Sequence, residues 1–513
     1  MKRVNGRADT SRRKGRRTLD RIPVKTEQGV FEAEKGEDLL RFLRRIGISV
    51  PSDCGGAGTC GKCAVDIVQG GTVFRVKACS YRIREEIAVL AAGKGEGQIR
   101  TANGTGDLPA GKDLAAVDLG TTAVSAVLCR GGRIYERTER NCLSVYGSDV
   151  ISRAGAIRER GELDRAAGML RDQLYGMISR LCGEAGCPLP GKVTVGGNTV
   201  MEHILAGRDP FPITVYPFEP QTLFRAGDRN VPLAERTCAE LMPCVSGYFG
   251  GDLTAGLYYL KNRMREGEKA LFIDIGTNGE MALWTEDGIT CCSVACGPAF
   301  EGGNISCGMT GTDGAVDHAF LEEGEIRYTV IGGGAPKGIC GSGILDLVAA
   351  LLSAGMVDET GRFLPPEESG VSMKGYGEDG DGNGILRLGE EVFVTAADIR
   401  SIQMAKAAVA AGISVLLAEQ GAGEDGIGSV YLAGGFGTLM DPESAVRIGM
   451  IPEALRDRCV PCGNTCLKGA ALAASSEEAE RELAQICGQC RYIELSTYGD
   501  FNELYIENMV FGG

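Results

Sequence analysis

Two segments of this 513-residue chain share one pattern although they lie far apart in the sequence. Residues 114–129 (LAAVDLGTTAVSAVLC) and 270–284 (ALFIDIGTNGEMALW) each contain an apolar strand, an Asp-x-Gly-Thr turn and a second apolar strand. Such an internal repeat indicates two halves built on one supersecondary plan. Helices are expected at 342–354 and 396–419, and strands that alternate with helices favour the α/β class. The repeat therefore predicts a duplicated module with two lobes.

The turns of the repeat carry residue types that suit phosphate binding. Asp118 and Asp274 end the two buried strands, where their carboxylates would hold Mg²⁺ and an attacking water through intervening waters. Glycine lets each turn approach a ligand, and hydroxyls and backbone N–H groups then face it. A third segment, 429–440 (SVYLAGGFGTLM), is a strand that runs into a glycine pair able to approach an adenosine. The predicted nucleotide ligands are Asp118, Gly120, Thr121, Thr122, Asp274, Gly276, Thr277, Asn278, Gly434 and Gly435.

Four cysteines, Cys54, Cys60, Cys63 and Cys79, have the spacing C-x5-C-x2-C-x15-C, and glycines surround the first three. Four thiolates can hold a 2Fe–2S cluster, and the plant-type ferredoxin spacing differs by a first gap one residue shorter. The glycines allow backbone N–H groups to approach the cluster sulfides. Zinc is the main alternative, but zinc knuckles usually contain two C-x2-C pairs and only one is present here. Inert thiols are the third interpretation.

The pattern along the chain divides it into five segments. Residues 1–20 contain eight Lys and Arg against two Asp, and we interpret them as a disordered basic extension or a misassigned start rather than a nucleic-acid arm. Residues 21–95, with two short strands, a helix and a further strand around the cysteines, fit the β-grasp plan of ferredoxins. The Gly-rich and polar residues 96–113 read as a linker. A first lobe at 114–208 and a second lobe at 209–513 follow.

Composition restricts the partners and the compartment. The net charge of −14 disfavours general binding to nucleic acid or anionic membranes. No stretch reaches the roughly 18 uninterrupted apolar residues of a membrane span. The first twenty residues lack the apolar core of a secretory signal. The twenty cysteines fit a reducing cytosol with many buried thiols, such as Cys291, Cys292 and Cys340. We therefore expect a cytoplasmic protein.

A second cysteine group, near the end of the chain, could form another metal site. We favour buried free thiols, because the group lies among apolar residues. His203 and His318 are the only histidines, and neither receives a role. The segment GICGSG (338–343) precedes a helix, where it would either present N–H groups to an anion or form a tight turn, so we leave it outside the site. The second cysteine group is Cys459, Cys462, Cys466, Cys487 and Cys490.

Together, the two hairpins and the glycine pair resemble the phosphate-1, phosphate-2 and adenosine motifs of the acetate kinase/sugar kinase/Hsp70/actin superfamily. Longer blocks, from about Ile22 to Phe511, are similar to one group, the reductive activators of corrinoid proteins. Two departures from that group are Cys142-Leu143, where Pro-Gln is expected, and a short linker. The blocks are YGSDVISRAGAI, VGGNTVMEHILAG, GYFGGDLTAGL, CGPAFEGGNISCGM, GICGSGILDLVAALL, DIRSIQMAKAAVAAGI and AGGFGTLMDPESAVRIGMIP.

This resemblance implies a fold of α/β and α+β class: a β-grasp 2Fe–2S ferredoxin domain followed by a duplicated RNase H-like ATPase module. It implies an ATP-dependent enzyme that passes one electron to the inactive Co(II) corrinoid of a methyltransferase-system protein and restores Co(I). The implied cofactors are the 2Fe–2S cluster, ATP and Mg²⁺. The implied partners are that corrinoid protein and an unidentified low-potential electron donor, with no nucleic acid and no membrane, and a homodimer is compatible with them.

Three other functions remain open from the residues. An activator of another low-potential enzyme, such as a 2-hydroxyacyl-CoA dehydratase, would share one 4Fe–4S cluster between two subunits. Iron stoichiometry and EPR would distinguish it from a protein with a 2Fe–2S cluster. A non-enzymatic ATP-gated redox sensor or scaffold would bind partners according to the redox state of the cluster without delivering an electron. A kinase of small metabolites is the third, although no sugar- or acetate-binding signature is recognisable.

Overall fold

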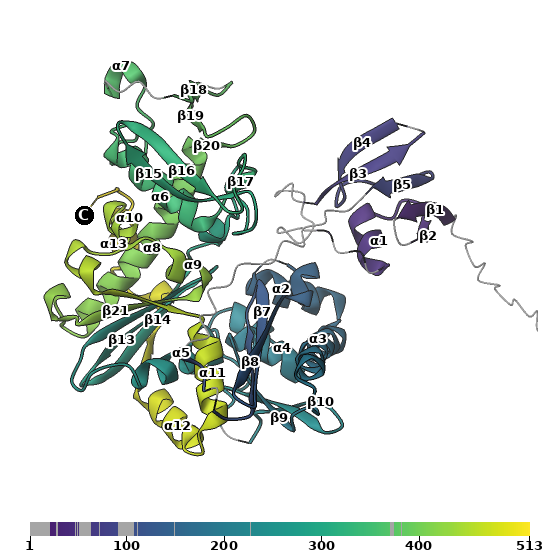
Figure 1. The fold of residues 1–513 in the computed structure, drawn as a ribbon, viewed down its shortest axis with the longest axis vertical. Coiled ribbons are helices and arrows are strands. Elements are labelled where there is room, and N and C mark those ends of the chain that lie inside the picture. The colour runs from purple at the N-terminus through teal and green to yellow at the C-terminus, as the bar shows by residue number, and fades with distance from the viewer. Residues whose placement is uncertain are drawn as a thin grey trace, which may run out of the picture. The chain divides into compact units, whose positions relative to one another are not determined.

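The chain forms two compact units, residues 1–95 and 96–513, which we describe separately. Figure 1 shows the elements of both in a computed structural model. The residues that the structure describes are 21–26, 29–46, 48, 50, 63–70, 72–90, 107–109, 111–147, 149–225, 227–369, 374–380 and 382–512.

In its described residues, the first unit contains a five-stranded sheet and one helix, α1 (Figure 1). The strand order is β2-β1-β5-β3-β4, in which β1 and β5 are parallel and the other neighbours antiparallel. In α1, Leu39, Phe42 and Leu43 recur at helical spacing and are buried in one cluster with Val24 and Ile67 of the sheet. The unit thus has its own core. Its elements are β1 (Arg21–Thr26), β2 (Gly29–Glu34), α1 (Leu39–Arg45), β3 (Ala64–Gln69), β4 (Thr72–Lys77) and β5 (Ile87–Leu90).

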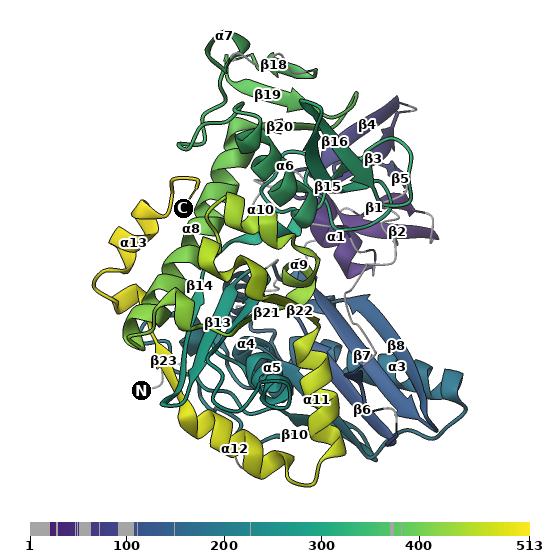
Figure 2. The same cartoon turned by 60° about the vertical axis from the view of Figure 1, so that its left-hand side comes forward.

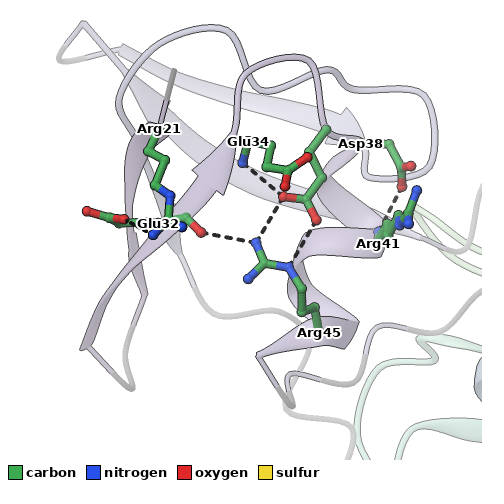
Figure 3. A network of polar contacts seen from close by, with 7 residues as sticks. Arg21, Glu32, Glu34, Asp38, Arg41 and Arg45 are labelled. Atoms are coloured by element: carbon green, nitrogen blue, oxygen red, sulfur yellow. Dashed lines mark hydrogen bonds and ion pairs between the residues drawn. The ribbon is translucent and has the colours of Figure 1, made fainter. Parts of the chain in front are cut away.

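A polar network fixes α1 against the first hairpin of this unit (Figure 3). At the start of the helix, the Asp38 carboxylate accepts the backbone N–H of Arg41 at 2.8 Å, as a helix cap does. At its end, Arg45 donates to both carboxylate oxygens of Glu37, at 3.1 and 2.9 Å, and to the Glu32 carbonyl at 3.0 Å. Bidentate contacts of this kind set orientation as well as distance. They hold α1 beside β2.

The second unit contains two six-stranded sheets with the same core arrangement. In the first, β6, β7 and β8 form an antiparallel meander and β9 lies parallel to β6. In the second, β12, β13 and β14 form the meander and β21 lies parallel to β12. This topology confirms the predicted duplication of an α/β plan. The strands of the first sheet, in spatial order, are β10 (Asn230–Ala234), β11 (Thr237–Leu241), β9 (Lys192–Gly197), β6 (Leu114–Leu119), β7 (Ala123–Arg130) and β8 (Arg133–Arg140).

The second sheet has the order β22-β21-β12-β13-β14-β23, and two smaller sheets accompany it. Its strands are β12 (Ala270–Ile275), β13 (Gly279–Thr285), β14 (Gly288–Val294), β21 (Ser429–Ala433), β22 (Cys459–Gly463) and β23 (Cys490–Ile493). The smaller sheets contain β15 (Ala315–Glu322), β16 (Glu325–Val330) and β17 (Gly338–Ile339), and β18 (Tyr376–Glu378), β19 (Gly384–Arg387) and β20 (Phe393–Thr395).

Helices pack on both sheets of this unit, as the two views in Figures 1 and 2 show. Those in the first half are α2 (Val150–Arg160), α3 (Leu163–Ala185), α4 (Thr199–Ala206) and α5 (Gly251–Lys261). Those in the second half are α6 (Gly341–Ser353), α7 (Pro366–Ser369), α8 (Ala396–Glu419), α9 (Gly434–Leu439), α10 (Pro442–Arg447), α11 (Thr465–Ser475), α12 (Ala479–Gln489) and α13 (Phe501–Glu507).

The limit of the first lobe differs from the sequence-based one. The sequence places it at residue 208, but β10 and β11 belong to the first sheet because β11 pairs in parallel with β9. The change of sheet therefore occurs between β11 and β12, along the segment that contains α5. Periodicity alone could not locate this limit, since it depends on which strands pair.

Among the helices of the described residues, one, α8, has the length and hydropathy of a membrane span. Within the fold, 78% of its most apolar stretch is buried. Its buried residues include Ile399, Ile402, Val409 and Leu416, which belong to the main core of the second sheet. The helix thus lies in the core of this unit, and its composition reflects burial on several sides.

Candidate functional site

A cavity of about 320 Å³ in the second unit is lined by residues from both six-stranded sheets. All ten residues predicted as nucleotide ligands line it: Asp118, Gly120, Thr121, Thr122, Asp274, Gly276, Thr277, Asn278, Gly434 and Gly435. The fold thus brings together three segments that are far apart in the sequence, because the hairpins occupy matching positions in the two sheets. Their role in binding a nucleotide stays a prediction.

In the first hairpin, neighbouring side chains hold Asp118 and Thr121. The Asn464 side-chain amide donates to Asp118 at 2.7 Å, and the Asn198 amide donates to the Thr121 hydroxyl at 2.9 Å. Burial raises the pKa of Asp118 to about 6, and the hydrogen bonds from Asn464 and Cys466 oppose that rise. The carboxylate therefore has a fixed orientation in the cavity.

In the second hairpin, Asp274 accepts no side-chain hydrogen bond among the described residues. Burial, and next the negative charge of Asp118, raise the pKa of Asp274 to about 7. Gly434 lies directly beside this carboxylate: it has a left-handed φ of 79°, and a Cβ there would lie 2.5 Å from the Asp274 Oδ1. Thr277 turns its hydroxyl to Glu301 at 2.6 Å. Only glycine fits where the third segment meets this hairpin.

Two further acidic residues, Asp252 and Glu280, line the same cavity. Burial and then the charge of Asp274 raise the pKa of Asp252 to about 8, and burial and then Asp252 raise the pKa of Glu280 well above its usual value. A set of buried carboxylates that repel one another favours a bound cation. Among the described residues, no three acidic, His or Cys side chains converge closely enough to bind a metal directly. The set fits Mg²⁺ that keeps most of its waters.

Sequence reasoning missed several residues of the cavity, namely Asn198, Asp252, Glu280 and Asn464. The tripeptide Gly-Asn-Thr occurs twice, at 197–199 and 463–465, and each copy follows a strand and begins a helix. In both copies the Asn caps its helix through the side-chain oxygen and turns its amide to the first hairpin. The repeated Gly-Asn-Thr is the sequence feature that could have identified both asparagines as residues of the site.

The GICGSG segment, which the sequence analysis left outside the site, contributes to the cavity. Cys340, Gly341 and Ser342 line it at the start of α6. The Phe300 and Phe436 rings also line it and stack with centroids 4.4 Å apart. The lining of the cavity therefore includes an aromatic pair beside the glycine turns, and an aromatic surface of this kind suits the base of a nucleotide.

In the first unit, two of the four predicted cluster cysteines can be placed, whereas Cys54 and Cys60 lie outside the described residues. Cys63 precedes β3 and Cys79 follows β4, and the antiparallel register of these strands puts the two thiols side by side. Their sulfurs are 3.2 Å apart, well beyond the length of a disulfide bond. Two thiols this close fit neighbouring positions on one iron–sulfur cluster.

The remaining cysteines and histidines agree with structural roles. Cys291, Cys292 and Cys340 are buried free thiols, as expected. His203 is fully buried and its Nδ1 lies 2.7 Å from the Thr199 carbonyl, while His318 lies 2.9 Å from the Asp346 carboxylate. In the second cysteine group, Cys462, Cys466 and Cys487 are buried, Cys459 and Cys490 are partly exposed, and none of the five forms a disulfide.

Three family models match the chain. They are the 2Fe-2S iron-sulfur cluster binding domain at 24–85, the RACo middle region at 114–265, and the C-terminal domain of RACo, the ASKHA domain, at 268–513. The first confirms a domain of the 2Fe–2S type, and the third confirms the type of ATPase module predicted from the hairpins.

Named relatives agree with these models. The chain is 30% identical over 417 residues to the corrinoid activation enzyme RamQ of Eubacterium limosum, which is 77% of this chain and 70% of RamQ. It is 30% identical over 224 residues, 39% of this chain and 38% of the relative, to the [Co(II) methylated amine-specific corrinoid protein] reductase of Methanosarcina barkeri. A solved reductive activator for corrinoid, iron-sulfur protein has a TM-score of 0.68 and 26% identity, over 96% of this chain and 98% of that one. The chain therefore belongs to the family of reductive activators of corrinoid proteins.

Proposed function

We propose that this protein is an ATP-dependent reductive activator that restores the Co(I) state of a methyltransferase-system corrinoid protein. The observation that carries the proposal is the union, in one chain, of a 2Fe–2S-type domain with the two-hairpin cavity. The 30% identity to RamQ over 417 residues supports it. An unidentified low-potential donor would supply the electron, and the proposal is compatible with a homodimer.

Each part of the chain has one task in this proposal. Cys54, Cys60, Cys63 and Cys79 hold the cluster, which supplies a one-electron carrier. Asp118 and Asp274 orient hydrated Mg²⁺ and the attacking water from opposite hairpins, and the Gly434 segment approaches the adenosine. Asp252 and Glu280 add negative charge around the cation. Bound there, the cluster would supply the single electron that reduces the partner's Co(II) to Co(I), while ATP and water would give ADP and phosphate.

Thermodynamics explains why an electron carrier would be joined to an ATPase. Plant-type 2Fe–2S centres have potentials of about −400 mV, and reduction of Co(II) corrinoid requires a lower potential. For one electron, each tenfold change in an equilibrium constant corresponds to about 59 mV. A preference of a few kcal/mol for one nucleotide state shifts the equilibrium by about 100 mV or more. That shift is sufficient to recharge an occasional oxidised cofactor.

The central test measures ATP hydrolysis and cobalt reduction together. Purified protein with reductant and ATP should form the Co(I) absorption of a Co(II) corrinoid protein, and its ATPase rate should rise when that partner is added. If the corrinoid protein does not change the ATPase rate and no Co(I) forms, the protein is not a reductive activator. An EPR signal from a 4Fe–4S cluster shared by two subunits would instead favour a dehydratase-type activator.

Removal of one cluster ligand should separate electron transfer from ATP hydrolysis. Cys60→Ala should abolish the red-brown visible absorption and the formation of Co(I), because three thiolates do not complete the cluster. Basal ATPase should remain, since the cavity lies in the other unit. The matched control is Cys238→Ser, a free, partly buried thiol of β11 that should leave the colour unchanged. A colourless wild-type protein that contains zinc would contradict the assignment.

A further inference from the structure

Asp107 belongs to the segment 96–113 that the sequence predicts as a linker, and it is the first described residue of that segment. The Tyr259 hydroxyl donates to its carboxylate at 2.8 Å, Lys468 donates at 3.4 Å, and Arg263 forms an ion pair with it. These partners come from two helices: Tyr259 belongs to α5, Arg263 follows α5 directly, and Lys468 belongs to α11. A single carboxylate thus joins α5 to α11.

The donors around Asp107 are themselves fixed. The Arg263 guanidinium lies 4.8 Å from the centre of the Tyr259 ring and the Lys468 ammonium lies 5.2 Å from it, so the ring is held by two cations. Lys468 is 5% exposed and also donates to the Cys462 carbonyl at 2.7 Å. The Tyr259 hydrogen bond is the main cause that lowers the pKa of Asp107. Asp107 and its three donors, which we call the anchor, therefore form a fixed network of hydrogen bonds and ion pairs rather than a chance surface ion pair.

Residues after Asp107 continue along α11. Leu108 is buried against Leu467, Ala470 and Ala471 of that helix. The Lys112 ammonium donates to the Ser475 carbonyl at the last residue of α11. Most of the described residues in 107–112 thus follow α11. In the sequence, residues 96–106 connect them to the first unit.

The same two helices connect the lobes and begin in the cavity. The chain passes from the first sheet to the second through α5, whereas α11 follows β22 of the second sheet and packs on β6 and β9 of the first. Asp252 of α5 and Cys466 of α11 line the cavity. The helices lie side by side (Figure 2), and a Cβ at Gly469 would lie 1.8 Å from the Ala255 carbonyl oxygen. Any movement of one lobe against the other must therefore act on this helix pair.

We propose that Asp107 is a positioning residue that transmits movement of the α5–α11 pair to the connection that carries the 2Fe–2S unit. The contacts run from the cavity to the anchor within one helix: Asn464 holds Asp118 and caps α11, and the Lys468 backbone N–H donates to the Asn464 carbonyl at 3.1 Å. This inference rests on the proposed function, because it assigns to that function the step that couples nucleotide state to electron delivery.

The test uses the full-length protein and two variants. Asp107→Asn keeps an acceptor for Tyr259 but loses the charge that joins Arg263 and Lys468. We expect ATPase activity close to that of the wild type and about fivefold less Co(I) per ATP hydrolysed, the lower end of usual coupling between sites. The control is Asp113→Asn, which removes a charge from the same segment but pairs with Arg130 rather than with either helix. It should behave as the wild type.

A second measurement does not depend on cobalt. With Mg²⁺ and a non-hydrolysable ATP analogue, hydrogen exchange should slow at the turn 120–122 and at 107–112 in the wild type, and at 120–122 alone in Asp107→Asn. Co(I) per ATP equal to wild type in Asp107→Asn, or an unchanged exchange response at 107–112, overturns the inference. If Asp107→Asn does not fold, Tyr259→Phe, which removes one hydroxyl, decides by the same criteria. If the wild type forms no Co(I), the proposed function fails, and hydrogen exchange alone decides on the anchor.

Discussion

The two phosphate-type hairpins have the same backbone but different surroundings. In each, an Asp is the next-to-last residue of the first strand, and the register pairs Asp118 with Ser125 and Asp274 with Glu280. Asp118 is held by Asn464, whereas Asp274 accepts no side-chain hydrogen bond among the described residues and faces a second acid instead. A duplicated scaffold therefore carries two different electrostatic environments.

This difference indicates a division of tasks between the lobes. A carboxylate that already accepts hydrogen bonds has a fixed direction, but its donors neutralise part of its negative charge. Such a group is suited to orienting a water molecule. A buried carboxylate without a donor, next to Glu280, is electrostatically destabilised until a cation arrives. If Mg²⁺ binds in this cavity as proposed, we therefore expect Asp274 to hold it more strongly than Asp118 does.

The largest expected effect separates the two aspartates. Asp274→Asn should lower ATPase about 100-fold or more, because charge on a catalytic metal contributes several kcal/mol. Asp118→Asn should also lower ATPase, but its dependence on Mg²⁺ concentration should stay closer to that of the wild type. The measurement is steady-state ATPase across a Mg²⁺ titration. Equal losses with equal Mg²⁺ dependence would show that the hairpins are equivalent.

A smaller effect is expected from the residue that distinguishes the first hairpin. Asn464→Ala removes both the cap of α11 and the hydrogen bond to Asp118, so it should cost about 1–2 kcal/mol of unfolding free energy and also reduce ATPase. The matched control is Asp441→Ala, which removes the cap of α10 outside the cavity. The control should lose similar stability in thermal unfolding and keep its ATPase. Similar ATPase in the two variants would contradict a role for Asn464 in the site.

The smallest effect concerns pH. Without Mg²⁺ and nucleotide, the folded-state pKa values of Asp118, Asp274 and Asp252, about 6, 7 and 8, exceed those of the unfolded chain. The stability that these protonated groups contribute is therefore fully present below about pH 4, the ordinary pKa of an Asp carboxyl, and is lost as pH rises from there to about 8. Each pKa unit of difference corresponds to about 1.4 kcal/mol. Thermal unfolding should show a falling Tm over this range, less so in Asp274→Asn, and Mg²⁺ with nucleotide should reduce the fall. A Tm that rises with pH in the apo protein would refute the carboxylate cluster.

Local patterns were sufficient to predict much of this protein. The Asp-x-Gly-Thr turns, the glycine pair at 434–435 and the cysteine spacing depend on neighbouring residues and on backbone freedom, and a sequence displays these directly. The duplicated plan followed from the repeat, and the two helices expected at 342–354 and 396–419 are α6 and α8. The family followed from longer blocks of the same kind.

Tertiary structure alone decided what depends on long-range pairing. Strand order placed β10 and β11 in the first sheet, beyond the lobe limit expected at residue 208. The approach of Asn464 to Asp118 and of Lys468 to Asp107 joins residues several hundred positions apart. Such contacts arise from how α11 packs between the lobes, and no local period encodes that packing. The charge environment of each aspartate follows from burial, which is a property of the folded chain.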